Sequence, residues 1–98
     1  MQIEKKINYN MLPAHMQDGM QNYIMMGIRP GNFLCSVLEN DLVGAFSNAD
    51  DVNARVMRSY ATFLYWEAPA ACWGSKEKVD TWIAHRGIAG MTEVKADA

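Results

Sequence analysis

Apolar residues recur at intervals of three and four along most of this chain, which is the spacing of one face of an α-helix. The first such stretch covers 12–27, where Pro13 suits a first helical turn and Gly27 is a typical helix stop. The turn that follows cannot continue this helix, because Pro30 biases Arg29 away from helical angles. The residues expected on the inner face of the helix are Leu12, Met16, Met20, Tyr23 and Ile24.

Two shorter apolar stretches follow, separated by the polar pair Asn40-Asp41. Either member of this pair can cap the helix that comes after it, since Asn and Asp side chains accept the free N–H groups of a first turn. The face expected for the first stretch consists of Phe33, Leu34, Val37 and Leu38. The face expected for the second consists of Leu42, Ala45 and Phe46.

The longest predicted helix covers roughly 50–67 and opens on the capping cluster Ser-Asn-Ala-Asp-Asp. Its expected inner residues are Val52, Val56, Tyr60, Phe63 and Leu64. After a connector, Ser75 is placed to cap a last helix that Gly87 ends. The buried face predicted for that helix consists of Val79, Trp82 and Ile83.

The two ends of the chain carry weaker patterns. Residues 1–10 alternate, with Ile3, Lys5, Ile7 and Tyr9 on one face, which favours an edge strand or an arm. Residues 88–98 show no periodicity, so we expect a mobile tail or a segment ordered against a partner chain. The sequence therefore predicts one domain over 1–98, with a helical core at 12–87: an all-α bundle of four to five short helices.

Charge and composition exclude several functions. The net charge of −2 argues against nucleic-acid binding, which requires a strongly basic face. No apolar run approaches the ~18–20 residues that span a bilayer, and the first residues do not form a signal peptide, so we expect no membrane and a cytoplasmic location. Five of the eight methionines lie between Met11 and Met26, and such flexible side chains suit irregular core packing as well as adaptable contact surfaces, such as an interface between copies of the chain.

No catalytic or metal motif is present. The spacing of His15, Cys35, Cys72 and His85 matches no zinc site, and we expect both cysteines to be small buried hydrophobic residues. The serines lie in no nucleophile elbow, and no glycine-rich phosphate loop occurs. The aspartates stand where helix caps are needed. We therefore expect no enzyme, no metal and no cofactor.

A set of aromatic, charged and amide residues near helix ends remains for binding. Stacking rings and guanidinium groups in this mixture suit a nucleotide-like ligand, but they also suit a protein interface. The Arg29 turn is interpreted first as a joint between helices, with an anion-binding corner as the alternative. The candidate ligand-binding residues are Tyr23, Arg29, Asn40, Asp41, Asn53, Arg58, Tyr65, Trp73 and Arg86.

The stretch "LPAHMQDGMQNYIMMGIRPGNFLCSVLENDLVGAF", followed by "ADDVN", "EAPAACWGS" and "VDTWIAHRG", resembles a family of small phage and prophage proteins. Their running pattern is LPxHM, YI, GxxPGxFL, VLxNDL, AD, N, AP, WGS and W, and the resemblance covers about 12–87. It implies a phage origin and a helical protein, and it carries over no catalytic residue.

Two functions follow from this resemblance and from the absence of catalytic motifs. The first is a non-enzymatic counter-defence protein in the host cytoplasm, which sequesters an anionic nucleotide signal as a homo-oligomer or blocks a host defence protein. The alternative is a phage adaptor or virion accessory protein that acts only through protein contacts.

Overall fold

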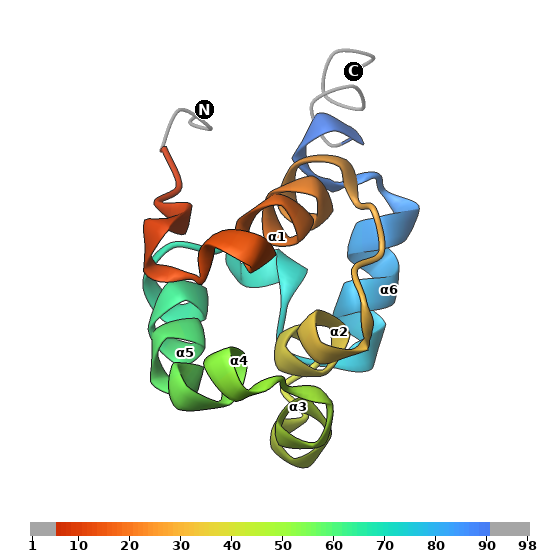
Figure 1. Cartoon of the computed structure of the whole chain (residues 1–98). Helices are drawn as coiled ribbons and strands as arrows, with labels where there is room; N and C mark the ends of the chain where they lie inside the picture. The colour runs from red at the N-terminus through yellow and green to blue at the C-terminus, as the bar shows by residue number, and fades with distance from the viewer. Residues whose placement is uncertain (1–5, 91–98) are drawn as a thin grey trace.

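Helices make up all the regular structure in residues 6–90, which are the residues that this computed structural model describes (Figure 1). The predicted all-α class is confirmed. A further helical turn occupies 87–90. The elements in chain order are η1 (Tyr9–Met11), α1 (Ala14–Met26), α2 (Asn32–Leu38), α3 (Leu42–Asn48), α4 (Asp51–Arg55), α5 (Met57–Trp66), η2 (Ala70–Cys72) and α6 (Lys76–Ala84).

The chain ends match their predictions only in part. Ile7 and Tyr9 are half-buried against the core, as the alternation indicated, but they lie in a loop and a 3-10 turn and not in a strand. Ile3 and Lys5 lie outside the described residues. The predicted tail is wrong at its beginning, because Ile88 packs on the core and the Gly90 N–H donates to the Arg86 carbonyl at 3.0 Å.

Side chains cap the helices where the sequence predicted caps. Asp41 accepts the Gly44 N–H at 2.9 Å, Asp50 accepts the Asn53 N–H at 2.7 Å, and Ser75 accepts the Lys78 N–H at 3.1 Å. Each of these bonds satisfies an N–H group that has no partner inside its own helix. Gly27 ends α1 in the left-handed conformation at φ 68°, as expected for a glycine stop.

The helix predicted over 50–67 is wrong in its continuity, because Val56 (φ −113°, ψ 26°) separates α4 from α5. The bend turns α4 so that Asn53 points inward, 2% exposed, while Val52 is 47% exposed. Asn53 stays inside because its side-chain oxygen accepts the Tyr60 hydroxyl at 2.7 Å. A buried polar group needs such a partner, so this bond fixes the direction of α4.

The core joins the end of α1 to η2 and α6. The Trp82 indole N–H donates to the carbonyls of Tyr23 at 3.0 Å and Ile24 at 3.2 Å, in the last turn of α1. The Tyr23 hydroxyl donates to the Cys72 carbonyl at 2.6 Å. These bonds satisfy carbonyl groups at a helix end and hold three distant segments together. Both cysteines are free and buried, as predicted.

Two glycines allow the backbone of α1 to touch the backbone after α6. A methyl group on Gly87 would lie 2.7 Å from the Gly27 nitrogen and 2.7 Å from the Ile24 carbonyl oxygen. Gly87 also has φ 64°, a conformation that other residues rarely adopt. The joint therefore requires glycine for both space and conformation. Within the described residues, no helix combines the length and the apolar character that crossing a membrane requires.

Candidate functional site

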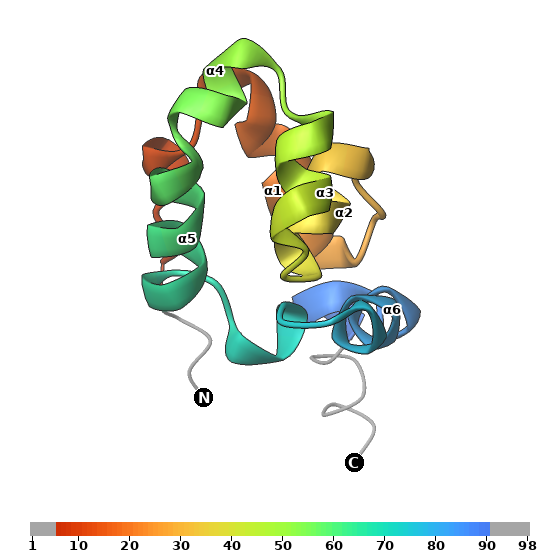
Figure 2. The ribbon, with the colours of Figure 1, turned by 90° about the horizontal axis from the view of Figure 1, so that it is seen from below.

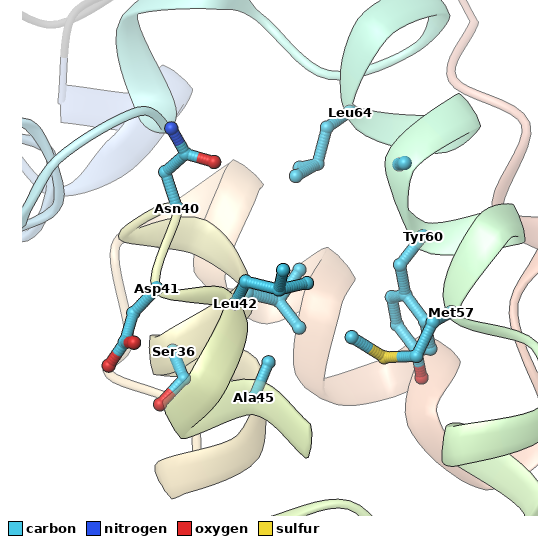
Figure 3. A pocket seen from close by; sticks show the side chains of 10 residues that line it. Ser36, Asn40, Asp41, Leu42, Ala45, Met57, Tyr60 and Leu64 are labelled. Carbon is cyan, nitrogen blue, oxygen red and sulfur yellow. The ribbon is translucent and has the colours of Figure 1, made fainter. Parts of the chain in front are cut away.

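A cleft of about 130 Å³ opens between the α2–α3 pair and α5. Figure 2 shows α5 facing α2 and α3 across the middle of the molecule, and Figure 3 shows the side chains that line the cleft. Its wall is mainly apolar, with polar groups near one end. The lining residues are Ser36, Val37, Asn40, Asp41, Leu42, Ala45, Met57, Tyr60, Ala61 and Leu64.

A tight reversal at Asn40 places α3 beside α2. Asn40 adopts φ 64°, which Asn tolerates better than most residues, and the Asp41 N–H donates to the Ser36 carbonyl at 2.9 Å. A methyl group on Gly44 would lie 2.9 Å from the Ser36 hydroxyl oxygen, so glycine permits the close approach of the two helices. α3 thus rests on α2 through its small residues, and Ala45 is 1% exposed.

The same packing leaves the larger apolar residues of α3 uncovered. Leu42 is 67% exposed, Val43 75% and Phe46 49%, and we call these three residues the α3 stripe. The prediction that Leu42 and Phe46 share a buried face with Ala45 is wrong for these two residues, because a short helix seated on Gly44 and Ala45 cannot also bury them. Exposed apolar side chains that adjoin an apolar cleft are typical of an interaction surface.

The α5 wall of the cleft is firmly held. The Tyr60 ring packs edge-on against Phe33 with 5.1 Å between centroids, and its hydroxyl donates to Asn53. Burial, and secondarily the negative charge of Asp50, raise the pKa of Tyr60, so its hydroxyl stays protonated. Met57 and Leu42 line the cleft from α5 and α3 respectively (Figure 3), and both side chains have rotamers that can adapt to an occupant.

The structure separates most of the nine predicted binding residues. Only Asn40 and Asp41 of this set line the cleft. Tyr23 and Asn53 are core residues, 0% and 2% exposed, and the side-chain oxygen of each takes part in an internal hydrogen bond. Trp73 is half-buried against the core.

The remaining predicted residues are at the surface in different elements. Arg29 pairs with Asp80 at 3.0 Å, and its guanidinium also donates to the Cys35 sulfur at 3.5 Å. This ion pair connects the α1–α2 loop to α6. Arg58 and Tyr65 are exposed on α5, and Arg86 is exposed after α6 with φ 62°.

The residues that sequence reasoning missed are the apolar ones: Leu42, Met57, Ala61 and Leu64 were either assigned to the core or not assigned. One signal was available. Leu42 and Val43 are adjacent apolar residues, and together with Phe46 they give the short helix an apolar arc wider than one buried face needs. As for metal chemistry, the described residues bring no three histidine, cysteine or carboxylate side chains together in a metal-binding arrangement.

Comparison with protein-family models, with curated proteins and with solved structures gives no match for this chain.

Proposed function

We propose that this protein is a non-enzymatic binding protein of phage origin that blocks a host defence protein. The observation that carries the proposal is the uncovered α3 stripe, which continues into an apolar cleft. A chain of this size can bury only a small hydrophobic core. The phage origin and the host target rest on the resemblance of residues 12–87 to small phage and prophage proteins.

The cleft suits a protein partner better than a nucleotide. A nucleotide carries phosphate charge, but the charged group that lines the cleft is the carboxylate of Asp41. Like charges at close range repel, and among the described residues no Arg or Lys lines the cleft to offset that repulsion. Exposed apolar side chains that adjoin an apolar cleft are, by contrast, typical of protein interaction sites.

Site-specific photo-crosslinking in bacterial cells tests the proposal. A photo-reactive amino acid replaces Val43, in the α3 stripe, or Glu77, an exposed residue on α6, and the cells are irradiated with and without phage infection. We expect a discrete host-protein adduct from position 43 and none from position 77. An adduct with a phage protein would favour the adaptor role, and the absence of a specific adduct at position 43 would refute binding through this surface.

The nucleotide alternative has its own measurement. Native mass spectrometry of the purified chain with a panel of cyclic and ADP-ribose-type nucleotides would reveal a defined added mass if the protein sequesters a signal. We expect no such mass at nucleotide concentrations that saturate specific sites. A nucleotide-bearing oligomer would overturn the proposal in favour of sequestration.

A further inference from the structure

The apolar surface formed by the cleft and the α3 stripe is continuous. With about 3.6 residues per turn, Ala45, Leu42, Phe46 and Val43 follow one another around the axis of α3. Ala45 and Leu42 line the cleft, while Phe46 and Val43 extend the apolar surface outward. A partner seated here would therefore contact both the cleft and the stripe.

The cleft has room for one large side chain. Its volume of about 130 Å³ is close to the roughly 150 Å³ of an apolar cavity that accommodates benzene. The cleft runs between two helices, α3 and α5, and the described residues offer no strand edge to which an extended peptide could pair. The binding mode that this arrangement favours is a helix lying in a groove with an apolar anchor.

The charges that flank α3 along the chain are acidic on both sides. Between Arg29 and Arg55 the sequence contains no Lys or Arg, but it contains Glu39, Asp41, Asp50 and Asp51. Asp41 caps the beginning of α3, and Asp50 caps the beginning of α4, shortly after α3 ends. Asp51, the next residue after Asp50, is exposed. Along the chain the α3 stripe thus has a carboxylate before it and two after it, of which Asp50 already contacts the His15 ring at 3.0 Å.

These charges discriminate between possible occupants. A second copy that paired through the same face by two-fold symmetry would bring carboxylates against carboxylates, which costs binding energy. A segment with Lys or Arg at both ends would instead meet opposite charge at both ends of α3. The seven residues of α3 span about 10 Å at ~1.5 Å per residue, so an apolar helix face of about two turns would cover the stripe between the basic ends.

We infer that this surface receives a basic amphipathic helix of the partner protein. One large apolar side chain of that helix enters the cleft, its neighbours cover the α3 stripe, and its terminal Lys or Arg residues pair with Asp41 and Asp51. The inference rests on the proposed function, because it names the chemistry of the protein that the chain binds.

The test uses two synthetic, fluorescently labelled helical peptides and the full chain. Both peptides have leucines at i, i+3, i+4 and i+7; one has lysines at its two ends and the other has glutamates there. We expect the lysine peptide to bind about tenfold or more tightly than the glutamate peptide in fluorescence anisotropy, and the ratio to shrink as salt rises. Equal binding of the two peptides, or no binding of the lysine peptide, would overturn the inference.

Matched variants locate the binding surface. Ala61→Phe fills the cleft from an exposed position on α5, and Thr62→Phe adds the same ring at the next exposed position, which does not line the cleft. We expect Ala61→Phe to weaken lysine-peptide binding about tenfold or more and Thr62→Phe to change it by less than about twofold. Similar effects of the two variants would exclude the cleft as the anchor site.

Charge removal tests the ends of α3. Asp41→Asn retains a good helix cap while removing the charge, and combining it with Asp51→Asn should weaken the lysine peptide about threefold to tenfold. The glutamate peptide should not weaken. An unchanged affinity for the lysine peptide would contradict the pairing of its ends with these carboxylates.

Two outcomes separate this inference from the proposed function. A crosslinked host protein at position 43 that contacts the chain through a neutral or acidic segment would refute the basic helix and leave the proposed function standing. Concentration-dependent dimerisation in sedimentation velocity, abolished by Val43→Asp, would assign the surface to a second copy and overturn the inference.

Discussion

Three tyrosines place their hydroxyl groups inside this protein, and the structure predicts opposite effects of removing them. Tyr23 donates to the Cys72 carbonyl at 2.6 Å and Tyr60 donates to Asn53 at 2.7 Å. The buried Tyr9 hydroxyl has no hydrogen-bond partner in the described part of the chain. A Phe substitution removes the same oxygen atom in each case and leaves the ring in place.

The expected magnitudes follow from what each hydroxyl leaves behind. Tyr23→Phe and Tyr60→Phe remove a buried hydrogen bond and should each lower the free energy of unfolding by about 1–2 kcal/mol. Tyr9→Phe removes a hydroxyl that was desolvated without compensation, so it should leave stability unchanged or raise it by up to about 1 kcal/mol. The contact between the Tyr9 and Phe63 rings, 5.6 Å between centroids, is retained.

Urea unfolding followed by far-UV circular dichroism measures these differences, with Tyr65→Phe as the control. Tyr65 is 70% exposed, so its substitution should change the free energy of unfolding by less than about 0.5 kcal/mol. Equal slopes against denaturant would show that the unfolded states are comparable. A loss for Tyr9→Phe as large as that for Tyr23→Phe would refute the reasoning, because it would mean that the Tyr9 hydroxyl has a partner in solution.

Three further predictions concern stability. Gly87→Ala should lower the free energy of thermal unfolding by about 2–4 kcal/mol, because the added methyl group meets backbone atoms at 2.7 Å and φ is 64°. Gly31→Ala, where the methyl group enters open space, should change it by less than about 1 kcal/mol. Equal losses for the two variants would contradict the close contact at Gly87. Ser75→Ala should cost about 1 kcal/mol by removing the cap of α6, and Ser75→Asp should restore it. Burial raises the pKa of Cys72 from 9.0 to about 12. The folded thiol therefore keeps its proton where the unfolded thiol loses it, so stability is full below about pH 9 and falls above it at up to ~1.4 kcal/mol per pH unit. Between about pH 9 and 10, the urea concentration at the unfolding midpoint should decline less steeply with pH in Cys72→Ala than in the unsubstituted protein. The same decline in both proteins would exclude the thiol as the cause.

Local signals in the sequence predicted local structure well. Gly27, Asp41, Asp50 and Ser75 end or begin helices where their backbone and hydrogen-bonding preferences place them, because these preferences act within one turn. Periodicity also identified the buried position of Trp82. Such features depend on neighbours in the sequence and need no knowledge of the rest of the fold.

Features that depend on contacts between distant residues were not predictable in this way. Periodicity shows that Leu42 and Phe46 share a face with Ala45, but it does not show that α3 is seated on α2 through Gly44. The bend at Val56 depends on a bond from Tyr60 to Asn53 that no spacing rule specifies. Most of the predicted binding residues lie apart from one another for the same reason, since residue type alone does not indicate whether a side chain turns inward.

The bonds from Trp82 to the end of α1 also determine when this protein can fold during its synthesis. The Tyr23 carbonyl precedes its indole partner by 59 residues. At ~5–20 residues per second, the ribosome adds that length in roughly 3–12 s. Throughout this interval the last turn of the nascent α1 lacks the indole that bonds to its carbonyl groups. The contact between α1 and α6 can therefore form only after α6 has been synthesised, so we expect the yield of folded protein to depend on what happens to the first half of the chain until then.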